Sequence, residues 1–145
     1  MTTQRQLTVR AATPEDEVAV YDLVAANMAT TFRVQRDIFH TSFHALVEAD
    51  HAFVLVADVG GQVGAYLLGF SHLAFFANGP IAWVEEIAVH EDLRRQGLGG
   101  QLMKEFENQA SATGARLIAL ATRRASSFYE AIGYQPSATY FRKIM

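Results

Sequence analysis

The feature that most constrains this chain is a predicted strand that runs through a glycine-rich turn directly into a helix. The stretch from Trp83 to Gly100 reads Trp-Val-Glu-Glu-Ile-Ala-Val-His-Glu-Asp-Leu-Arg-Arg-Gln-Gly-Leu-Gly-Gly. β-Branched and aromatic residues favour a strand over 81–89. A glycine loop at a helix start gathers free main-chain N–H groups at the positive end of the helix dipole. The sequence therefore predicts a site for a phosphate-bearing ligand, with Arg94 and Arg95 at its mouth.

Two common phosphate-binding loops do not fit this stretch. A P-loop needs Gly-Lys followed by Ser or Thr at the helix start, and Gly99 is followed instead by Gly and Gln. A dinucleotide fingerprint needs a third glycine where Leu102 stands, and an acidic residue after the next strand, which is absent here. The pattern that remains is Arg94-x-x-Gly97-x-Gly99.

That pattern resembles the Arg/Gln-x-x-Gly-x-Gly/Ala motif of the GNAT superfamily of acyl-CoA-dependent N-acetyltransferases. Two further segments match in the family's order. Glu-Glu-Ile-Ala-Val at 85–89 resembles its fourth strand, and Ser-Phe-Tyr-Glu-Ala-Ile-Gly-Tyr at 127–134 resembles its Phe-Tyr-Glu-x-x-Gly-Phe signature. The resemblance covers essentially the whole chain and implies a small, bacterial-type acetyltransferase with one domain over 1–145.

The predicted elements follow the order of that family. We expect an α/β fold with a mixed central sheet, the order β-α-α-β-β-β-α-β-α-β, and strands 4 and 5 splayed apart to admit acyl-CoA. Strands are predicted at 7–10, 53–59, 64–75, 81–89, 117–121 and 139–144, with Gly60-Gly61 as the turn between the second and the third. Helices are predicted from Thr13-Pro14 with Thr13 as N-cap, over about 37–49, from Leu98 to Gly114, and over 124–132 with Gly133 as cap. Leu98, Leu102, Phe106 and Ala110 repeat at i+4 and predict the buried face of the third helix.

The resemblance implies acetyl-CoA as cosubstrate. The splayed fourth strand would pair its main chain with the pantetheine arm, and the glycine loop would bind the pyrophosphate. The residues expected to hold the cosubstrate are Ile87, Ala88, Val89, Arg94, Arg95, Gln96, Gly97, Leu98, Gly99, Gly100 and Thr122. At Thr122 many relatives carry Asn, which puts that contact in question.

Glu85 and Glu86 interrupt an otherwise apolar strand just before the cosubstrate segment. A carboxylate there can take a proton from an incoming ammonium, directly or through one water. Neighbouring residues in a strand point to opposite faces, so one glutamate is expected to face the acceptor, unless a bulge re-aims them. Glu85 ranks first, because it shares strand parity with Trp83 and Ile87, and Glu86 ranks second; a solvated edge pair is the alternative.

Tyr129 lies on the short helix after the fifth predicted strand. The resemblance makes it the general acid that protonates the departing CoA thiolate. A phenol with an ordinary pKa near ~10 stays protonated at neutral pH, as an acid must. The alternative is a core tyrosine with its hydroxyl at the surface.

The histidines suggest no metal site. His40, His44 and Glu48 are spaced i, i+4, i+8 and could share one helix face, but the zinc-protease spacing is missing. His72 and His90 rank below the glutamates as alternative bases, and His90 fits better in the turn that leads to the arginines. We therefore expect no metal.

Composition excludes several classes of function. The net charge is −3, so no basic field favours nucleic acid or an anionic membrane. The chain has no cysteine, which excludes a thiol nucleophile and fits a reducing compartment. No apolar leader is visible in residues 1–6, and the apolar run at 65–77 is too short to span a bilayer. We expect a cytoplasmic, soluble protein.

The acceptor is the least constrained part of this interpretation. The leading hypothesis is a primary amine of a small molecule; the alternatives are a protein or peptide N-terminus or lysine, and a non-catalytic acyl-CoA-binding module. In the family, acceptor choice depends on segments that correspond here to 27–43 and 75–79, which are apolar and aromatic with Arg33, Arg36 and Asp37 between. The arginines could suit an acceptor that bears a carboxylate. A homodimer is left open.

Overall fold

The computed structural model describes residues 6–28 and 31–145. Residues 1–5, to which the prediction of no apolar leader refers, lie outside the described part, as do residues 29–30 of the expected acceptor segment. The strands are β1 (Leu7–Ala11), β2 (Ala52–Val59), β3 (Gln62–Ala74), β4 (Gly79–Val89) and β5 (Ile118–Leu120). The helices are η1 (Pro14–Asp16), α1 (Glu17–Asn27), α2 (Arg36–Glu48), η2 (Glu91–Leu93), α3 (Leu98–Ala112) and α4 (Ser126–Ala131). Within this described part no helix is long and apolar enough to cross a membrane.

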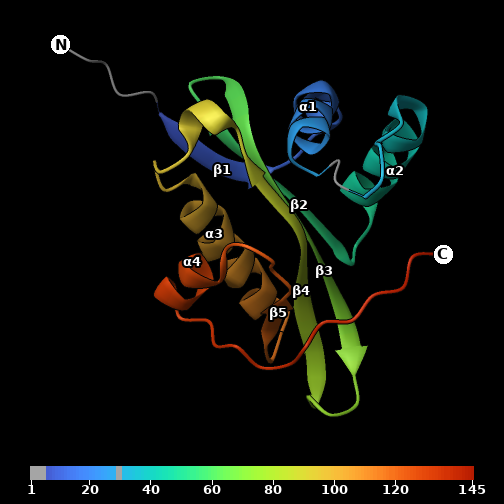
Figure 1. Ribbon diagram of the computed structural model, residues 1–145, viewed down its shortest axis with the longest axis vertical. Coiled ribbons are helices and arrows are strands. Elements are labelled where there is room, and N and C mark those ends of the chain that lie inside the picture. Colours follow the sequence, from blue (N-terminus) through green and yellow to red (C-terminus); the bar gives the residue numbers. More distant parts are fainter. Residues whose placement is uncertain (1–5, 29–30) are drawn as a thin grey trace.

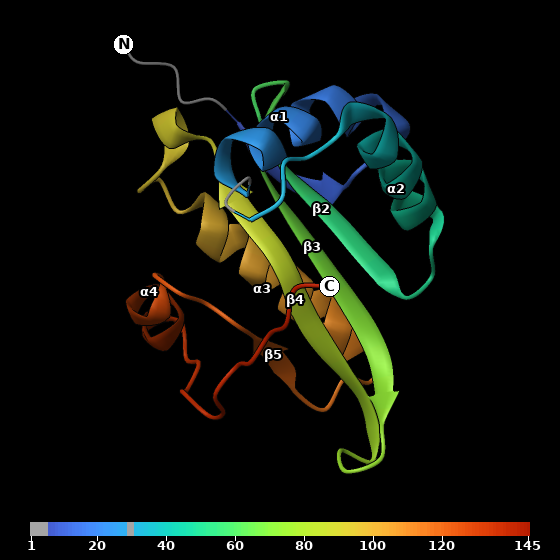
Figure 2. The ribbon, with the colours of Figure 1, turned by 45° about the vertical axis from the view of Figure 1, so that its right-hand side comes forward.

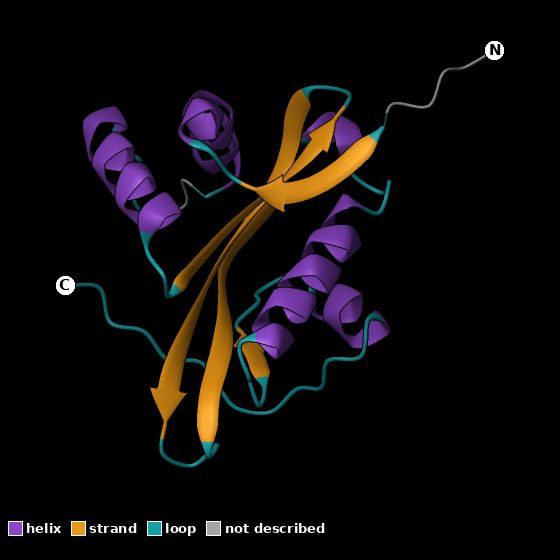
Figure 3. Ribbon diagram, turned by 180° about the vertical axis from the view of Figure 1, so that it is seen from behind, coloured by secondary structure: helices purple, strands orange, loops and turns teal. Residues whose placement is uncertain are grey.

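The five strands form one sheet in the order β1-β2-β3-β4-β5. Neighbouring strands are antiparallel except β4 and β5, which run parallel. Helices α1 and α2 lie on one face of the sheet, and α3 and α4 lie on the other (Figures 1 and 3). The predicted α/β fold class with a mixed sheet is confirmed.

Each face of the sheet has its own core. On the α3 face, the predicted i+4 stripe of Leu98, Leu102, Phe106 and Ala110 is buried against β2, β3 and β4. On the other face, Val20 and Leu23 of α1 and Phe43 of α2 pack against residues that include Val56 and Tyr66. Because α1 and α2 cover only part of that face, side chains of β3 and β4 there can line a cavity.

A bulge in β4 changes which face its side chains take. Leu68 of β3 pairs with Glu86, and the next residue, Gly69, pairs with Val84, so Glu85 is an extra residue without a partner. Strict alternation would put Val84 and Ala88 on one face, but Val84 packs in the α3 core and Ala88 in the opposite core. The bulge thus turns Glu86 and Ala88 toward α1 and α2.

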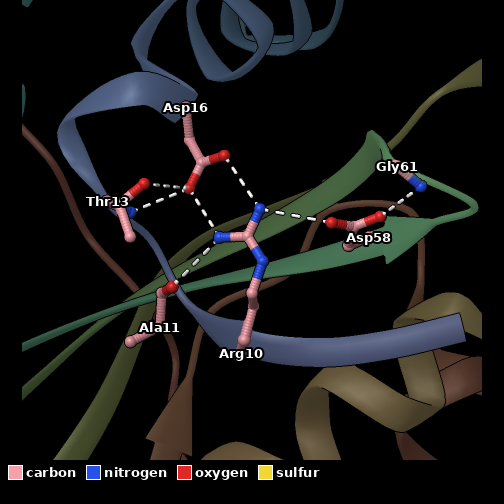
Figure 4. Close-up of polar contacts among 6 residues, drawn as sticks. All are labelled: Arg10, Ala11, Thr13, Asp16, Asp58 and Gly61. Carbon is pink, nitrogen blue, oxygen red and sulfur yellow. Dashed lines mark hydrogen bonds and ion pairs between the residues drawn. The ribbon is translucent and has the colours of Figure 1, made fainter.

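The start of the first helix is fixed by a charge cluster at the end of β1 (Figure 4). The Arg10 Nη1 and Nη2 atoms donate to the two carboxylate oxygens of Asp16 at 2.7 and 3.0 Å, and Nη2 also donates to Asp58 at 3.3 Å. Thr13 donates its main-chain N–H to Asp16 at 2.8 Å. The Arg10 hydrogen bonds lower the pKa of Asp16. Thr13 is the N-cap as predicted, but the first turn is η1 before α1 begins.

The predicted last strand, Thr139–Ile144, is wrong. Residues 135–145 follow α4 without regular structure. β5 has three residues and ends the sheet, so it offers little main chain for another strand to pair with. Adjacent Tyr140 and Phe141 are both exposed, at 61% and 86%, so no alternating buried face exists. The segment runs back to the connector before α2, where Arg142 donates to the Thr31 hydroxyl at 3.2 Å.

Gly69 provides a stability test of the packing beside the bulge. A Cβ on Gly69 would lie 2.5 Å from the Phe106 ring, which is fully buried and has little room to yield. We expect Gly69→Ala to lower the free energy of unfolding by about 1–3 kcal/mol in urea denaturation. Gly100→Ala is the control: its Cβ meets open space in helix α3, where alanine is preferred over glycine. Equal stability of Gly69→Ala and the parent would contradict this packing.

Candidate active site

A cavity of about 350 Å³ lies between α1, α2, the connector at 32–35 and the sheet. Most of its wall is apolar, with α1, α2, β2 and β3 contributing side chains such as Val20, Phe39 and Leu68. Glu86 of β4 also lines it, as does Tyr66 of β3. The expected acceptor segment 27–43 therefore lines the cavity through residues 32–43, whereas Phe75 and Phe76 lie exposed at the distant β3–β4 hairpin tip (Figure 1).

Glu86 is held in the cavity wall by a hydrogen bond from Tyr66. The Tyr66 hydroxyl donates to Glu86 Oε1 at 2.8 Å. Burial raises the pKa of Glu86, the Tyr66 hydrogen bond opposes that rise, and the neighbouring Glu85 charge adds to it. The pKa of Tyr66 is also raised, by burial and by Glu86. The site therefore contains one carboxylate that is less acidic than usual and able to take up a proton.

Glu85 lies outside this cavity. It is exposed, and its Oε2 accepts a hydrogen bond of 2.7 Å from Trp83 Nε1. The ranking of Glu85 above Glu86 assumed unbroken strand alternation, and the bulge at Glu85 removes that assumption. In geometry, Glu86 is the carboxylate that reaches the cavity.

The loop before α3 has the backbone shape of an anion site. Arg95 and Gly97 both adopt left-handed conformations, with φ of 64° and 84°. Helix α3 begins its main-chain hydrogen bonding at Gln101, whose N–H donates to the Gly97 carbonyl at 3.0 Å. The three N–H groups from Leu98 to Gly100 precede it and have no acceptor within the helix. With open space beside Gly97 and Gly100, the loop fits a pyrophosphate close to the main chain.

The two loop arginines are placed differently. The Arg94 Nε atom donates to the Val89 carbonyl at 3.3 Å, and its Nη2 atom donates to Asn27 Oδ1 at 2.7 Å. Arg94 thus links the end of β4, the loop and the end of α1. Arg95 is exposed, so its side chain is accessible to an anion at the loop.

Strands β4 and β5 stop pairing before β4 ends, as the family resemblance implied. Their pairing runs from Ala82 with Ile118 to Val84 with Leu120, whereas β4 continues to Val89. In the described part of the chain, no strand pairs with this edge of β4 from Glu85 onward. The main chain of Ile87, Ala88 and Val89 lies on this segment, which leads through η2 to the glycine loop (Figure 2). The edge is available to an extended ligand.

Tyr129 lies on α4 and packs against the α3 face of the sheet. Its ring is 7% exposed and meets Phe128 and Tyr134 edge-on. Burial raises the pKa of Tyr129, so the phenol is protonated well beyond neutral pH. Thr122 precedes this helix and accepts a hydrogen bond of 3.1 Å from the Ala125 N–H. Thr122 therefore orders the helix start with its hydroxyl.

Three of the histidines make side-chain contacts with neighbouring segments. Glu17 Oε1 contacts His40 Nδ1 at 2.8 Å and His44 Nε2 at 2.7 Å, which ties α1 to α2. These three ligand atoms lie within 4.8 Å of one another, and hydrogen bonding accounts for their arrangement. Glu48, the third residue of the i, i+4, i+8 spacing, is not in the group. His90 Nδ1 accepts from the Asp92 N–H at 3.1 Å and so belongs to the turn, as expected.

Tyr66 is the site residue that the sequence analysis missed. Its signal was a single tyrosine in the otherwise apolar run Val-Gly-Ala-Tyr-Leu-Leu. Linking Tyr66 to Glu86 required the cross-strand register, which depends on the bulge.

Comparison with known proteins identifies the family. The model of the acetyltransferase (GNAT) domain matches residues 48–136. Aminoalkylphosphonate N-acetyltransferase of Salmonella typhimurium is 31% identical over 142 residues, which cover 94% of this chain and 90% of that enzyme. The chain belongs to the GNAT acetyltransferase family, and the expected enzyme class, an N-acetyltransferase, is confirmed. Enzymes of this family use acetyl-CoA as cosubstrate.

A second relative shares only part of the chain. The tRNA(Met) cytidine acetyltransferase TmcA of Aeropyrum pernix is 41% identical over 88 residues. That match spans 54% of this chain but 12% of the length of that enzyme. It supports the shared acetyltransferase domain and carries no information about the rest of that larger protein.

Solved structures share the fold over almost the whole chain. A transcriptional regulator from Bacillus halodurans C-125 has a TM-score of 0.88 at 22% identity, covering 97% of this chain and 100% of that one. Glucosamine-6-phosphate N-acetyltransferase from Arabidopsis thaliana has a TM-score of 0.82 at 17% identity, covering 96% and 98%. At these identities the similarity concerns the fold alone.

Proposed function

We propose that the protein transfers the acetyl group of acetyl-CoA to a primary amine of a small molecule, by direct attack in a ternary complex. The observation that carries the proposal is the position of Glu86. Its carboxylate lines the α1–α2 cavity and lies on β4, two residues beyond the last pairing with β5. Glu86 therefore stands between a cavity for the acceptor and a free strand edge for the cosubstrate.

In this proposal Glu86 and Tyr129 carry out two of the proton transfers of the reaction. Acetyl-CoA supplies a thioester whose acyl group the amine nitrogen attacks. Glu86 accepts the proton that the acceptor ammonium must lose, and Tyr129 donates its phenolic proton to the sulfur that leaves as thiolate. The ammonium loses two protons in all: Glu86 accepts the first before attack, and the second leaves the nitrogen after attack and returns to the Tyr129 phenolate through solvent. Glu86 then releases its proton to solvent, so each turnover yields the amide, the free CoA thiol and one proton. Glu85 acts on this chemistry only through its charge beside Glu86.

The cosubstrate residues follow from the loop and strand geometry. We assign the pyrophosphate to the main chain of Gly97 to Gly100, with Arg95 as an added cation. The pantetheine arm pairs with the main chain of 87–89. Arg94 orders the loop through Asn27, and Thr122 orders the start of α4.

A small-molecule acceptor is supported by the bounded volume of the cavity, about 350 Å³, which is in the range of small-ligand pockets. The Salmonella relative, whose name gives an aminoalkylphosphonate as acceptor, supports the same class. The test is free-thiol release from acetyl-CoA with a panel of small amines, amino acids and peptides. Release only with peptides would favour the protein-acetylating alternative, and release with none would favour a binding module. We also propose that the chain forms one domain over 1–145 and that the protein is cytoplasmic. Whether it forms a homodimer is left open.

The glycine loop gives a prediction for cosubstrate binding. Gly97 has φ of 84°, where a branched side chain costs about 1–2 kcal/mol, and its Cβ direction is open to a ligand. We expect Gly97→Val to weaken CoA binding about tenfold or more in calorimetry. Gly61→Val carries a similar strain, at φ of 91°, in the β2–β3 turn and is the matched control. CoA affinity equal to that of the parent in folded Gly97→Val would reject the loop as the pyrophosphate site.

The hydrogen bond between Tyr66 and Glu86 gives a prediction for the pH profile. A base must be ionised, so activity should fall in acid through a pKa above the ordinary glutamate value of 4.5. Tyr66→Phe removes a contact that lowers the pKa of Glu86, so the acid limb of kcat/KM should move to higher pH. Glu85→Gln removes a charge that raises this pKa, so the limb should move to lower pH. Shifts of the same sign in both variants would contradict Glu86 as the base.

A further inference from the structure

The cavity that Glu86 lines carries information about the acceptor that the family assignment does not. We propose that the acceptor is a primary amine whose remaining part is an uncharged apolar group, aryl or branched alkyl. This inference rests on the proposed function, because it takes Glu86 as the group that receives the amine. It assigns the cavity between α1, α2 and the sheet as the binding site of the apolar group.

The two charged residues that line the cavity differ in how far they are exposed to water. Among the described residues that line it, Glu86 is the sole acid and Arg33 the sole base. Glu86 is partly buried on the sheet, whereas Arg33 is exposed on the connector before α2. An ammonium group fits beside Glu86, where it meets a fixed opposite charge and the Tyr66 oxygen. An anionic group elsewhere in the cavity would lose water with only a solvated arginine to compensate.

Part of the apolar wall of the cavity is exposed to water, as expected for a surface that an apolar ligand covers. Phe32 and Ile38 line the cavity, yet they are 69% and 57% exposed. Deeper in the cavity, Phe39 and Phe43 stack at 5.6 Å, and Phe43 is buried. An aryl or branched alkyl group placed here removes apolar surface from water on both sides, which stabilises binding.

The other arginine of the segment is already engaged. The guanidinium of Arg36 lies 4.4 Å from the centre of the Tyr21 ring, and neither residue lines the cavity. Arg36 is therefore explained by stacking on α1 rather than by an acceptor carboxylate. Only Arg33 is left to favour an anionic acceptor, and it can be tested directly.

The experiment compares phenylethylamine, aminoethylphosphonate and a lysine-containing peptide as acceptors in free-thiol release. We expect kcat/KM for phenylethylamine to exceed that of either other acceptor by about tenfold or more. Ile38→Lys, which adds a cation at the exposed mouth, should lower kcat/KM for phenylethylamine and raise it for the phosphonate. Val18→Lys adds the same charge at an exposed α1 position that does not line the cavity, and should change neither.

The other outcomes separate this inference from the proposed function. Preference for the phosphonate, with loss of that preference in Arg33→Ala, overturns the apolar acceptor and leaves the acetyltransferase proposal standing. Preference for the peptide also overturns the apolar acceptor, and it favours the protein-acetylating alternative over a small-molecule acceptor. If no amine is acetylated, the proposed function fails. Thermal protection by phenylethylamine in the presence of CoA then tests separately whether the cavity binds an apolar amine. Protection that Ile38→Lys abolishes supports the cavity as an apolar-amine site; its absence in the parent protein overturns it.

Discussion

Replacing Glu86 by Gln should lower kcat/KM for the acceptor by roughly 10²-fold or more. Glutamine keeps the volume of the side chain and can still accept the hydrogen bond from Tyr66, so the fold and the cavity should be preserved. What is lost is the ability to take a proton from the ammonium. CoA affinity should be nearly intact, because the cosubstrate residues lie on the loop and on the strand edge. Steady-state kinetics and calorimetry measure the two quantities separately.

The matched control is Glu85→Gln, one residue away on the same strand. Glu85 is exposed and bonded to Trp83, so its neutral form should change the rate far less than that of Glu86. The residual rate of Glu86→Gln should rise with pH, because more of the acceptor is then already deprotonated. Normal turnover in both single variants and the double variant would place the base elsewhere, with His72 and His90 as the next candidates.

The sequence predicted the local backbone and packing features around the candidate site. Gly97 adopts a left-handed conformation and opens α3, as a glycine before a helix start indicates. The Leu98–Ala110 stripe is buried at helical spacing, and the Gly60-Gly61 turn joins β2 to β3 with φ of 62° and 91°. Each of these features is encoded within a few neighbouring residues, so periodicity and turn residues sufficed.

The sequence did not predict which glutamate reaches the cavity. Strand alternation is a local rule, and it favoured Glu85. The bulge that reverses the order belongs to the pairing between β3 and β4, beside Gly69, where the Phe106 ring occupies the space that a Cβ would need. The same limit applies to Tyr66, which meets Glu86 only across strands, and to Glu17, which meets His40 and His44 only across helices. Contacts between elements need the register and the packing angle, which no single segment contains.

The failed final strand has a related cause. Residues 139–144 have strand-forming side chains, but a strand also needs a partner with unpaired main chain. β5 pairs with β4 over three residues only, and the chain beyond α4 finds no such edge in the described structure. The side chains of this segment favour a strand, but the short β5 at the end of the sheet offers too little unpaired main chain for the segment to pair with.

Tyr129→Phe should lower kcat by about 10- to 10³-fold while CoA affinity is preserved, because proton donation to the thiolate contributes in or after the transition state. The variant keeps the buried ring between Phe128 and Tyr134, so thermal stability should change little. The high-pH limb of the profile should weaken or move, since it reports loss of the phenol proton, whose pKa burial raises. Tyr134→Phe is the control, because it removes a hydroxyl from the neighbouring ring that bonds Glu107 at 2.7 Å. Full turnover of Tyr129→Phe across pH, together with a lower melting temperature, would make Tyr129 a packing residue and leave water as the proton donor.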